Sequence, residues 1–168
     1  QGKIRYIGLC HTNLDDYLKA SQVENVEMLQ SEYNIFNSSA FESLRPIIEE
    51  KKVTLFSWGT FDKGIVSGRV TRERKFEESD CRSWAPWWKK SDKNKKIKKM
   101  EKILSLLKLN DLTGVDLALC HFFENKEINC SLVGPRTIKQ LKDLVDRVNM
   151  RKMSRDIYLS AMELLSEE

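Results

Sequence analysis

The chain has 168 residues, of which 40% are hydrophobic and 32% are charged, and its formal net charge is +4. This length is ample for one compact domain and short for two, and the composition is that of a globular protein. No apolar run reaches the roughly 20 residues that span a bilayer, and the first residues lack the apolar core of a signal peptide. We therefore expect a cytoplasmic protein with no membrane partner.

The four cysteines, at positions 10, 81, 120 and 130, show no C-x-x-C spacing, and only two histidines accompany them. This pattern favours free thiols over a metal site or a disulfide framework. The chain begins at Gln1 rather than at methionine, which we interpret as a processed or truncated start.

The first third of the chain follows a β, α, β, α, β order. Strands are expected over residues 3–10, 26–33 and 53–58, and Asn13 is the expected N-cap of the first helix. Pro46 suggests that the regular part of the second helix starts late, with Ser43 as its cap. This regular spacing is typical of parallel βαβ units.

Residues 70–91 interrupt this order with a charged stretch that contains Pro86 and tryptophans 84, 87 and 88. Long loops inside compact domains are usually functional, although a tryptophan cluster can simply pack a loop onto the body. After this excursion we expect a helix around residues 97–107, a helix over 114–123, a strand over 128–134, a helix that follows Thr137, and a last helix over 154–165.

A dense run of lysines covers the helix around residues 97–107. Because apolar residues recur there at helical spacing, these lysines are expected on a solvated helix face, and without a recognised binding motif we expect no nucleic acid partner. The lysines expected on this face are Lys95, Lys96, Lys98, Lys99 and Lys102. His121, on an amphipathic helix, is expected to be a packed residue rather than a catalyst.

The stretch 54–69 joins a buried strand to a loop that contains three glycines. Trp58 stands where the strand stops, and Ser67, Gly68 and Arg69 offer a hydroxyl, a closely approachable backbone and a guanidinium to a phosphate. A flat aromatic ring followed by an anion-binding loop is what a dinucleotide requires.

Residues 131–137 form a similar strand-to-loop arrangement at the next strand. Ser131 lies in the strand, Gly134 and Arg136 follow it, and Thr137 caps a helix. Free backbone N–H groups, the positive end of a helix and a guanidinium therefore converge, which predicts an anion site.

The first stretch resembles the strand-seven loop of the aldo/keto reductases, which are NADP-dependent (β/α)8 barrels. The resemblance implies that Trp58 stacks on the nicotinamide ring and that the loop from Phe61 through Gly64 to Arg69 wraps the pyrophosphate. It places Gly59 and Ser67 in the same cofactor-binding set. Where the family usually has Ser-Pro-Leu after the aromatic residue, this chain has residues 59–61, Gly-Thr-Phe.

Three other strand ends carry the same resemblance. Gln30, in LQSEYN, is similar to the family glutamine that bonds the nicotinamide carboxamide, and Cys10 and His11 occupy the strand-five position. Arg82 matches an Asp-x-Arg pattern whose arginine contacts the adenine-side phosphate. The end of strand eight supplies the remaining set, in which the adenosine phosphate and the adenine are bound by Ser131, Gly134, Arg136 and Gln140.

The resemblance implies the fold class: α/β, the C-terminal half of a (β/α)8 TIM barrel, with about strands 5–8 and their helices. Residues 1–150 would form this half and residues 151–168 a helix on its outside. A complete barrel needs roughly 250 residues. The implied cofactor is NADP, and the substrate is a small-molecule carbonyl that is reduced to an alcohol.

No catalytic residue is assigned to this chain, because the family's Tyr, Lys, Asp and His belong to the missing N-terminal half of the barrel. That half is therefore an expected partner. Because the sheet would have two unpaired edges, the isolated chain should be prone to aggregate, self-associate or require that half. One alternative is a nucleotide-sensing regulatory subunit of aldo/keto reductase fold, similar to the β subunits of potassium channels. Another is a plain interaction module that binds through the tryptophan cluster and the lysine face.

Overall fold

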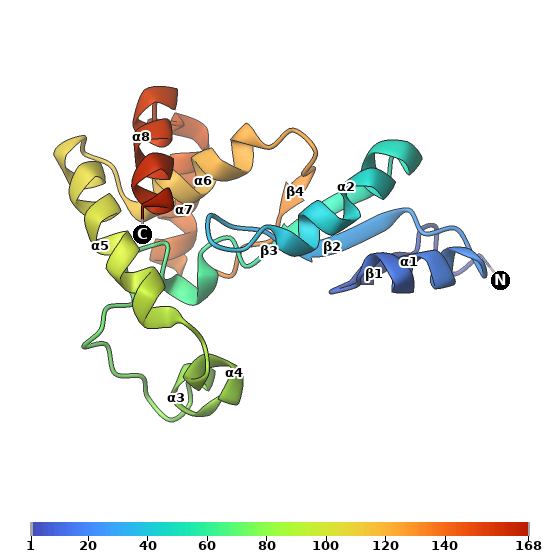
Figure 1. Cartoon of the computed structure of the whole chain (residues 1–168), viewed down its shortest axis with the longest axis horizontal. Coiled ribbons are helices and arrows are strands. Elements are labelled where there is room, and N and C mark those ends of the chain that lie inside the picture. Colours follow the sequence, from blue (N-terminus) through green and yellow to red (C-terminus); the bar gives the residue numbers. More distant parts are fainter. Residues whose placement is uncertain (1, 168) are drawn as a thin grey trace.

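The computed structural model describes residues 2–167, which form a parallel four-stranded sheet with helices around it (Figure 1). The strands pair side by side in sequence order and are β1 (Gly8–Cys10), β2 (Met28–Glu32), β3 (Thr54–Trp58) and β4 (Cys130–Ser131). All three pairings are parallel, which confirms the predicted βαβ units. The carboxyl ends of the four strands therefore open at one edge of the sheet.

Three helices begin where the sequence places their first residues. The side chains of Asn13, Thr137 and Ser154 each accept a hydrogen bond from a backbone N–H three residues later. None of the described helices is both long enough and apolar enough to cross a membrane. They are α1 (Leu14–Ser21), α2 (Ser39–Lys51), the 3-10 helix η1 (Asp62–Gly64), α3 (Cys81–Trp84), α4 (Pro86–Lys89), α5 (Lys93–Leu109), α6 (Gly114–Glu124), α7 (Ile138–Met150) and α8 (Arg155–Ser166).

The sheet has one helix-covered face and one half-buried face. Leu29 and Leu55, paired in register on β2 and β3, are fully buried against Phe41 and Leu44 of α2. The next residues along the two strands, Gln30 on β2 and its register partner Phe56 on β3, are only partly buried. Because side chains alternate across a strand, these partly buried residues lie on the second face of the sheet.

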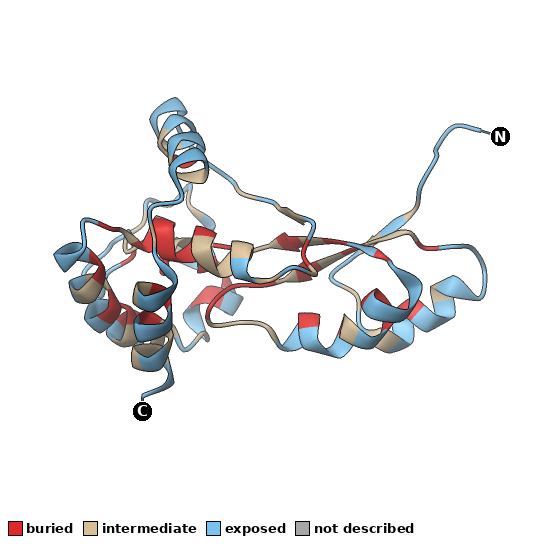
Figure 2. Ribbon diagram, turned by 90° about the horizontal axis from the view of Figure 1, so that it is seen from above, coloured by how far each residue is buried: buried red, intermediate tan, exposed pale blue. Residues whose placement is uncertain are grey.

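A second core lies between α5, α6 and α8, next to the loop that follows β3 (Figure 2). Ile103 and Leu107 of α5, Leu117 of α6 and Ala161 of α8 are fully buried there. The α8 helix thus packs against α5 and α6. The division of the chain at residue 150 stays a prediction, and its outer residues, Gln1 and Glu168, lie outside the described residues.

Both edge strands are shorter than predicted. The chain enters β1 at Gly8 rather than at residue 3, and the backbone N–H of Ile7 donates to the Glu27 carboxylate at 2.9 Å instead of to a strand. β4 has only two residues. Just before β4, the backbone N–H of Leu55 donates to the side-chain oxygen of Asn129 at 2.8 Å, in place of a hydrogen bond to a strand carbonyl. An edge strand has a neighbour on one side only, so side chains readily take over its ends.

The predicted late start of the second helix is wrong. Helix α2 begins at Ser39, and Pro46 lies inside it. Phe41 and Leu44 are fully buried, so packing holds the first turns in helical form despite the proline. Glu42 and Pro46 are both exposed, so the carbonyl that loses its partner faces solvent.

Candidate functional site

The loop after β3 is held in place by a buried asparagine. Gly59 adopts a φ of 75°, which lets the chain turn at the end of the strand. The Asn34 side chain, 3% exposed, donates to the Gly59 carbonyl at 2.9 Å and accepts from the backbone N–H groups of Phe36 and Asn37. One side chain therefore connects the ends of β2 and β3.

A buried carboxylate anchors the same loop to α5. Asp62 is 2% exposed, and its carboxylate lies 2.8 Å from the Lys96 ammonium and 3.3 Å from that of Lys63, which also pairs with Glu32 at 2.8 Å. The expectation that every lysine of this run is solvated is therefore wrong for Lys96. A buried carboxylate requires a charged partner, and α5 provides the nearest one.

Helix α6 packs directly against the backbone of this loop. A Cβ atom built on Gly114 would lie 1.9 Å from the Val66 carbonyl oxygen. Only glycine permits this approach, and it places the positive end of α6 behind Ser67. Thr113 and Asp116 form the capping box of α6, and Arg147 of α7 pairs with the buried Asp116.

The excursion at residues 70–91 is tied to both neighbouring strand ends by one carboxylate. Asp80 caps α3 and accepts from Arg82 at 2.9 and 2.6 Å, while Arg136 donates to it at 3.0 Å. The Arg82 guanidinium also donates to the Lys63 carbonyl at 2.6 Å. The hydrogen bonds from Arg82, with a further one from Arg136, hold the pKa of Asp80 well below its ordinary value.

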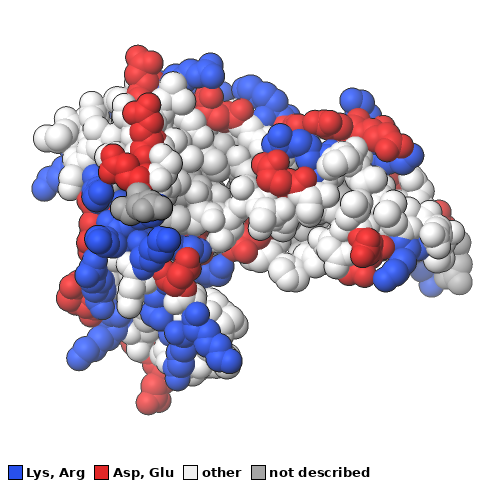
Figure 3. All heavy atoms as spheres, in the orientation of Figure 1, with Lys and Arg blue, Asp and Glu red and all other residues white. Residues whose placement is uncertain are grey.

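An open cavity of about 650 Å³ lies between the loop after β3, the excursion and the start of α7. This volume is in the range of small-molecule and cofactor sites. Arg69 is exposed and forms no ion pair with any described residue, and Lys and Arg side chains gather over α3, α4 and α5 (Figure 3). The predicted site residues that line the cavity are Gly59, Phe61, Gly64, Ser67, Arg69, Arg82, Gly134, Arg136 and Gln140.

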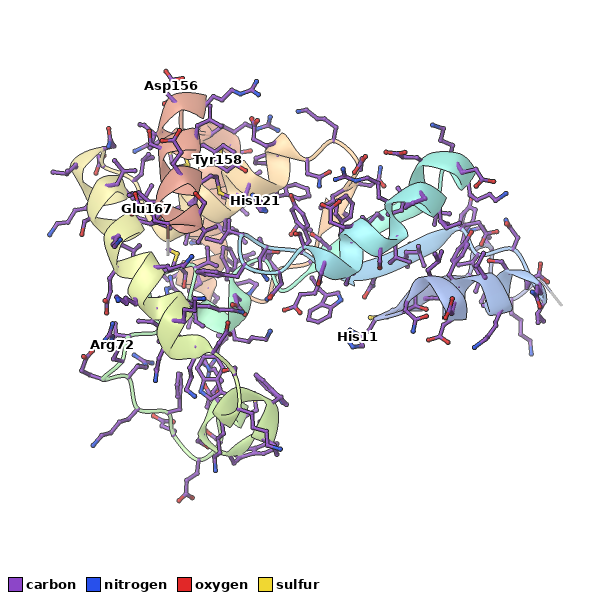
Figure 4. All side chains as sticks on the ribbon, viewed as in Figure 1. His11, Arg72, His121, Asp156, Tyr158 and Glu167 are labelled. Atoms are coloured by element: carbon purple, nitrogen blue, oxygen red, sulfur yellow. The ribbon has the colours of Figure 1, made fainter. Side chains whose placement is uncertain are left out.

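The other five predicted residues do not line this cavity. Cys10 and Gln30 are in register on β1 and β2, and the Trp58 ring lies 5.7 Å from the ring of His11, which follows β1 (Figure 4). The Trp58 Nε1 is buried without a hydrogen-bond partner. Ser131 lies next to the cavity, since its hydroxyl is 2.6 Å from that of Thr60, a lining residue. The structure therefore separates the predicted set into a cavity group and a strand-edge group.

Several lining residues were not predicted from the sequence. Arg74, Phe76 and Trp87 contribute from the excursion, and Lys63 from the loop. Trp88 is 4% exposed and packs into the core, whereas Trp87 is 50% exposed on the cavity wall. α4 spans only four residues, too few for an amphipathic period to indicate which tryptophan faces inward.

His121 is packed away from the site, as predicted. Its ring stacks on Tyr33 at 4.8 Å between centroids, and its Nδ1 lies 2.9 Å from the Tyr158 hydroxyl of α8 (Figure 4). Burial lowers the pKa of His121 to about 4 and raises that of Tyr158 to about 12. Neither residue lines the cavity. Within residues 2–167, no group of three or more metal-ligating side chains is placed to hold a metal ion.

Comparison with known families gives a match that covers almost the whole chain. Residues 1–159 match the aldo/keto reductase family. The chain belongs to this family. The match extends over all four strands and every predicted site residue.

Curated aldo/keto reductases share up to about a third of the aligned residues with this chain. The chain is 30% identical to Aldo-keto reductase YhdN of Bacillus subtilis over 89 residues, which are 53% of this chain and 27% of that protein. It is 27% identical to Aldo-keto reductase yakc [NADP(+)] of Schizosaccharomyces pombe over 148 residues, 84% of this chain and 43% of the other. The matches thus span less than half the length of these relatives.

Solved aldo/keto reductases share the fold. The chain superposes on the glycerol dehydrogenase AKR11B4 of Gluconobacter oxydans with a TM-score of 0.77 and 19% identity, covering 98% of this chain and 50% of that one. For AKR11C1 of Bacillus halodurans, the TM-score is 0.68 at 18% identity, with 97% and 52% covered. The chain therefore has an α/β fold that corresponds to about half of these aldo/keto reductase structures.

Proposed function

We propose that this chain is the NADP-binding, C-terminal half of a (β/α)8 aldo/keto reductase that reduces a carbonyl to an alcohol. The observation that carries the proposal is the cavity in which Arg69, Arg82 and Arg136 meet. They come from the loop after β3, the excursion and the chain after β4, and they gather positive charge where a dinucleotide carries its phosphates. Membership of an oxidoreductase family supports the same conclusion.

The residues suit the separate parts of the cofactor. Ser67 and Arg69 would face the pyrophosphate, and Arg136 the adenosine phosphate. Gln30 and Trp58 would hold the nicotinamide, and the free Nε1 of Trp58 is a buried donor without a protein partner. A Cβ atom at Gly134 would meet no protein atom within 4 Å, so the backbone there is open to a ligand. When bound, NADPH supplies the hydride.

The open edges of the sheet and the length of the relatives also support this assignment. Within residues 2–167, β1 and β4 each pair with one strand only, and the residues on the second face of the sheet are only partly buried, which suits the interior face of an incomplete barrel. The matched relatives are about twice as long as the aligned region or longer. None of the lining residues is a tyrosine or a histidine that could donate a proton to a carbonyl. We therefore propose that the proton donor belongs to the other half.

The test is a comparison of NADP+ and NAD+ binding to the chain by isothermal titration calorimetry. NADP+ should bind more tightly, and Arg136→Ala should raise the Kd for NADP+ about 10- to 100-fold, the effect of one charge-assisted hydrogen bond. Arg72→Ala is the matched control, because Arg72 lies on the same excursion, pairs with Glu101 and is not a lining residue. Equal affinities for the two cofactors, unchanged in Arg136→Ala, would refute NADP binding at this cavity.

A second test addresses catalysis. The chain should be inactive alone, and joining it to an N-terminal half from a complete aldo/keto reductase should restore carbonyl-dependent NADPH oxidation. Cofactor binding without activity in such a joined barrel would instead favour the nucleotide-sensing subunit.

A further inference from the structure

We propose that Trp87 is the stacking surface for the adenine ring of the cofactor. This inference rests on the proposed NADP site and adds a residue that positions the adenine end. Trp87 is the first tryptophan of the PWWK segment that forms α4, and it lines the same cavity as Arg82, Arg136 and Gln140. Trp87 belongs to the excursion, whose Asp80 bonds Arg136 of the chain segment after β4.

A dinucleotide has two flat rings, and each needs an apolar or aromatic surface in the protein. Trp58 at the strand edge is the proposed partner of the nicotinamide and does not line the cavity. The adenine therefore requires a second surface beside the arginines. The aromatic residues that line the cavity are Phe61, Phe76 and Trp87.

The two phenylalanines are already engaged. Phe61 packs against the core between α5, α6 and α8. The Phe76 ring carries the Arg82 guanidinium on its face at 4.2 Å from the centroid, and its edge contact with Trp88 is at 5.9 Å. One face of the Phe76 ring is therefore covered by the guanidinium, and both phenylalanines are less exposed than Trp87.

Trp87 differs from both because half of its surface is exposed. It contacts Trp88 edge to face at 6.3 Å and 75°, and Trp88 is itself buried at 4% exposure. The buried Trp88 thus anchors the α4 backbone, so little backbone entropy is lost when Trp87 binds a ligand. An anchored and exposed indole that lines the same cavity as Arg69, which forms no ion pair with any described residue, is suited to a base attached to a phosphorylated ribose.

The test measures the Kd of the chain for NADP+ and for adenosine 2′,5′-bisphosphate, which lacks the nicotinamide, in Trp87→Leu and Trp87→Phe. Leucine is apolar but has no π-face, whereas phenylalanine retains one. Trp87→Leu should raise both Kd values by the same factor, roughly 5- to 150-fold, and Trp87→Phe should stay much nearer the wild type. Trp84→Leu is the matched control, because Trp84 is 60% exposed on α3 but does not line the cavity.

Each other outcome overturns the inference. Equal affinity of Trp87→Leu and wild type, or equal losses in the Phe and Leu variants, would show that no ring stacks there. A loss for NADP+ but not for the bisphosphate would assign Trp87 to another part of the cofactor. An equal loss in Trp84→Leu would indicate a general disturbance of α3 and α4. If wild type binds neither ligand, the proposed function itself fails.

Discussion

Replacement of Gly114 by alanine tests the contact that positions the cavity loop. The new Cβ atom would lie 1.9 Å from the Val66 carbonyl oxygen, whereas Cβ atoms essentially never approach closer than 3.0 Å, so the two backbones must separate by about 1.1 Å. Such overpacking costs roughly 1–3 kcal/mol, and a backbone neighbour cannot rotate away as a side chain can. Alanine restricts the unfolded chain and returns about 0.4–1 kcal/mol. At the midpoints of these two ranges, we expect a net loss of about 1.3 kcal/mol in the free energy of unfolding.

The assay is urea unfolding of the chain, followed by circular dichroism, with Gly134→Ala as the matched control. Neither glycine has a positive φ, but a Cβ atom at Gly134 meets nothing within 4 Å, so the control should stay within about 0.5 kcal/mol of wild type. Displacement of Val66 also moves Ser67, so Gly114→Ala should weaken NADP+ binding as well. A Gly114→Ala protein as stable as wild type would refute the close contact between α6 and the loop.

Two further substitutions test buried titratable groups, one in an ion pair and one a neutral histidine. Lys96→Met removes the ammonium 2.8 Å from the buried Asp62, which keeps Lys63 at 3.3 Å, and should lower the free energy of unfolding by about 2 kcal/mol. The exposed Lys95→Met should change little in the same urea titration, and equal small effects would contradict a buried pair. Burial lowers the pKa of His121 to about 4 from 6.5, so the unfolded chain binds more protons between these values and stability falls as the pH drops through this window, by up to about 1.4 kcal/mol per pH unit. His121→Gln should make the urea midpoint less sensitive to pH between 6.5 and 4, and an unchanged dependence would contradict a buried neutral imidazole.

Much of the candidate site could be predicted because its residues follow strands. In a parallel sheet every strand end opens at one edge, so a motif placed after a strand is also placed in space. Gly64, Ser67 and Arg69 after β3, and Gly134 and Arg136 after β4, line one cavity for this reason. The cavity-lining residues of the excursion were harder to predict from the sequence, because no periodic pattern relates Arg74 or Trp87 to a strand.

Local signals and tertiary packing therefore determined different features of this protein. The sequence by itself determined the order of the four strands and the six longer helices, the helix caps at Asn13 and Thr137, and the glycine corners, because each depends on a few neighbouring residues. Only the tertiary structure decided that Pro46 stays inside a helix and that Lys96 pairs with a buried carboxylate. It also decided that Trp87 faces the cavity while Trp88 enters the core. These outcomes depend on burial and charge contributed by segments distant in sequence, and no local pattern carries that information.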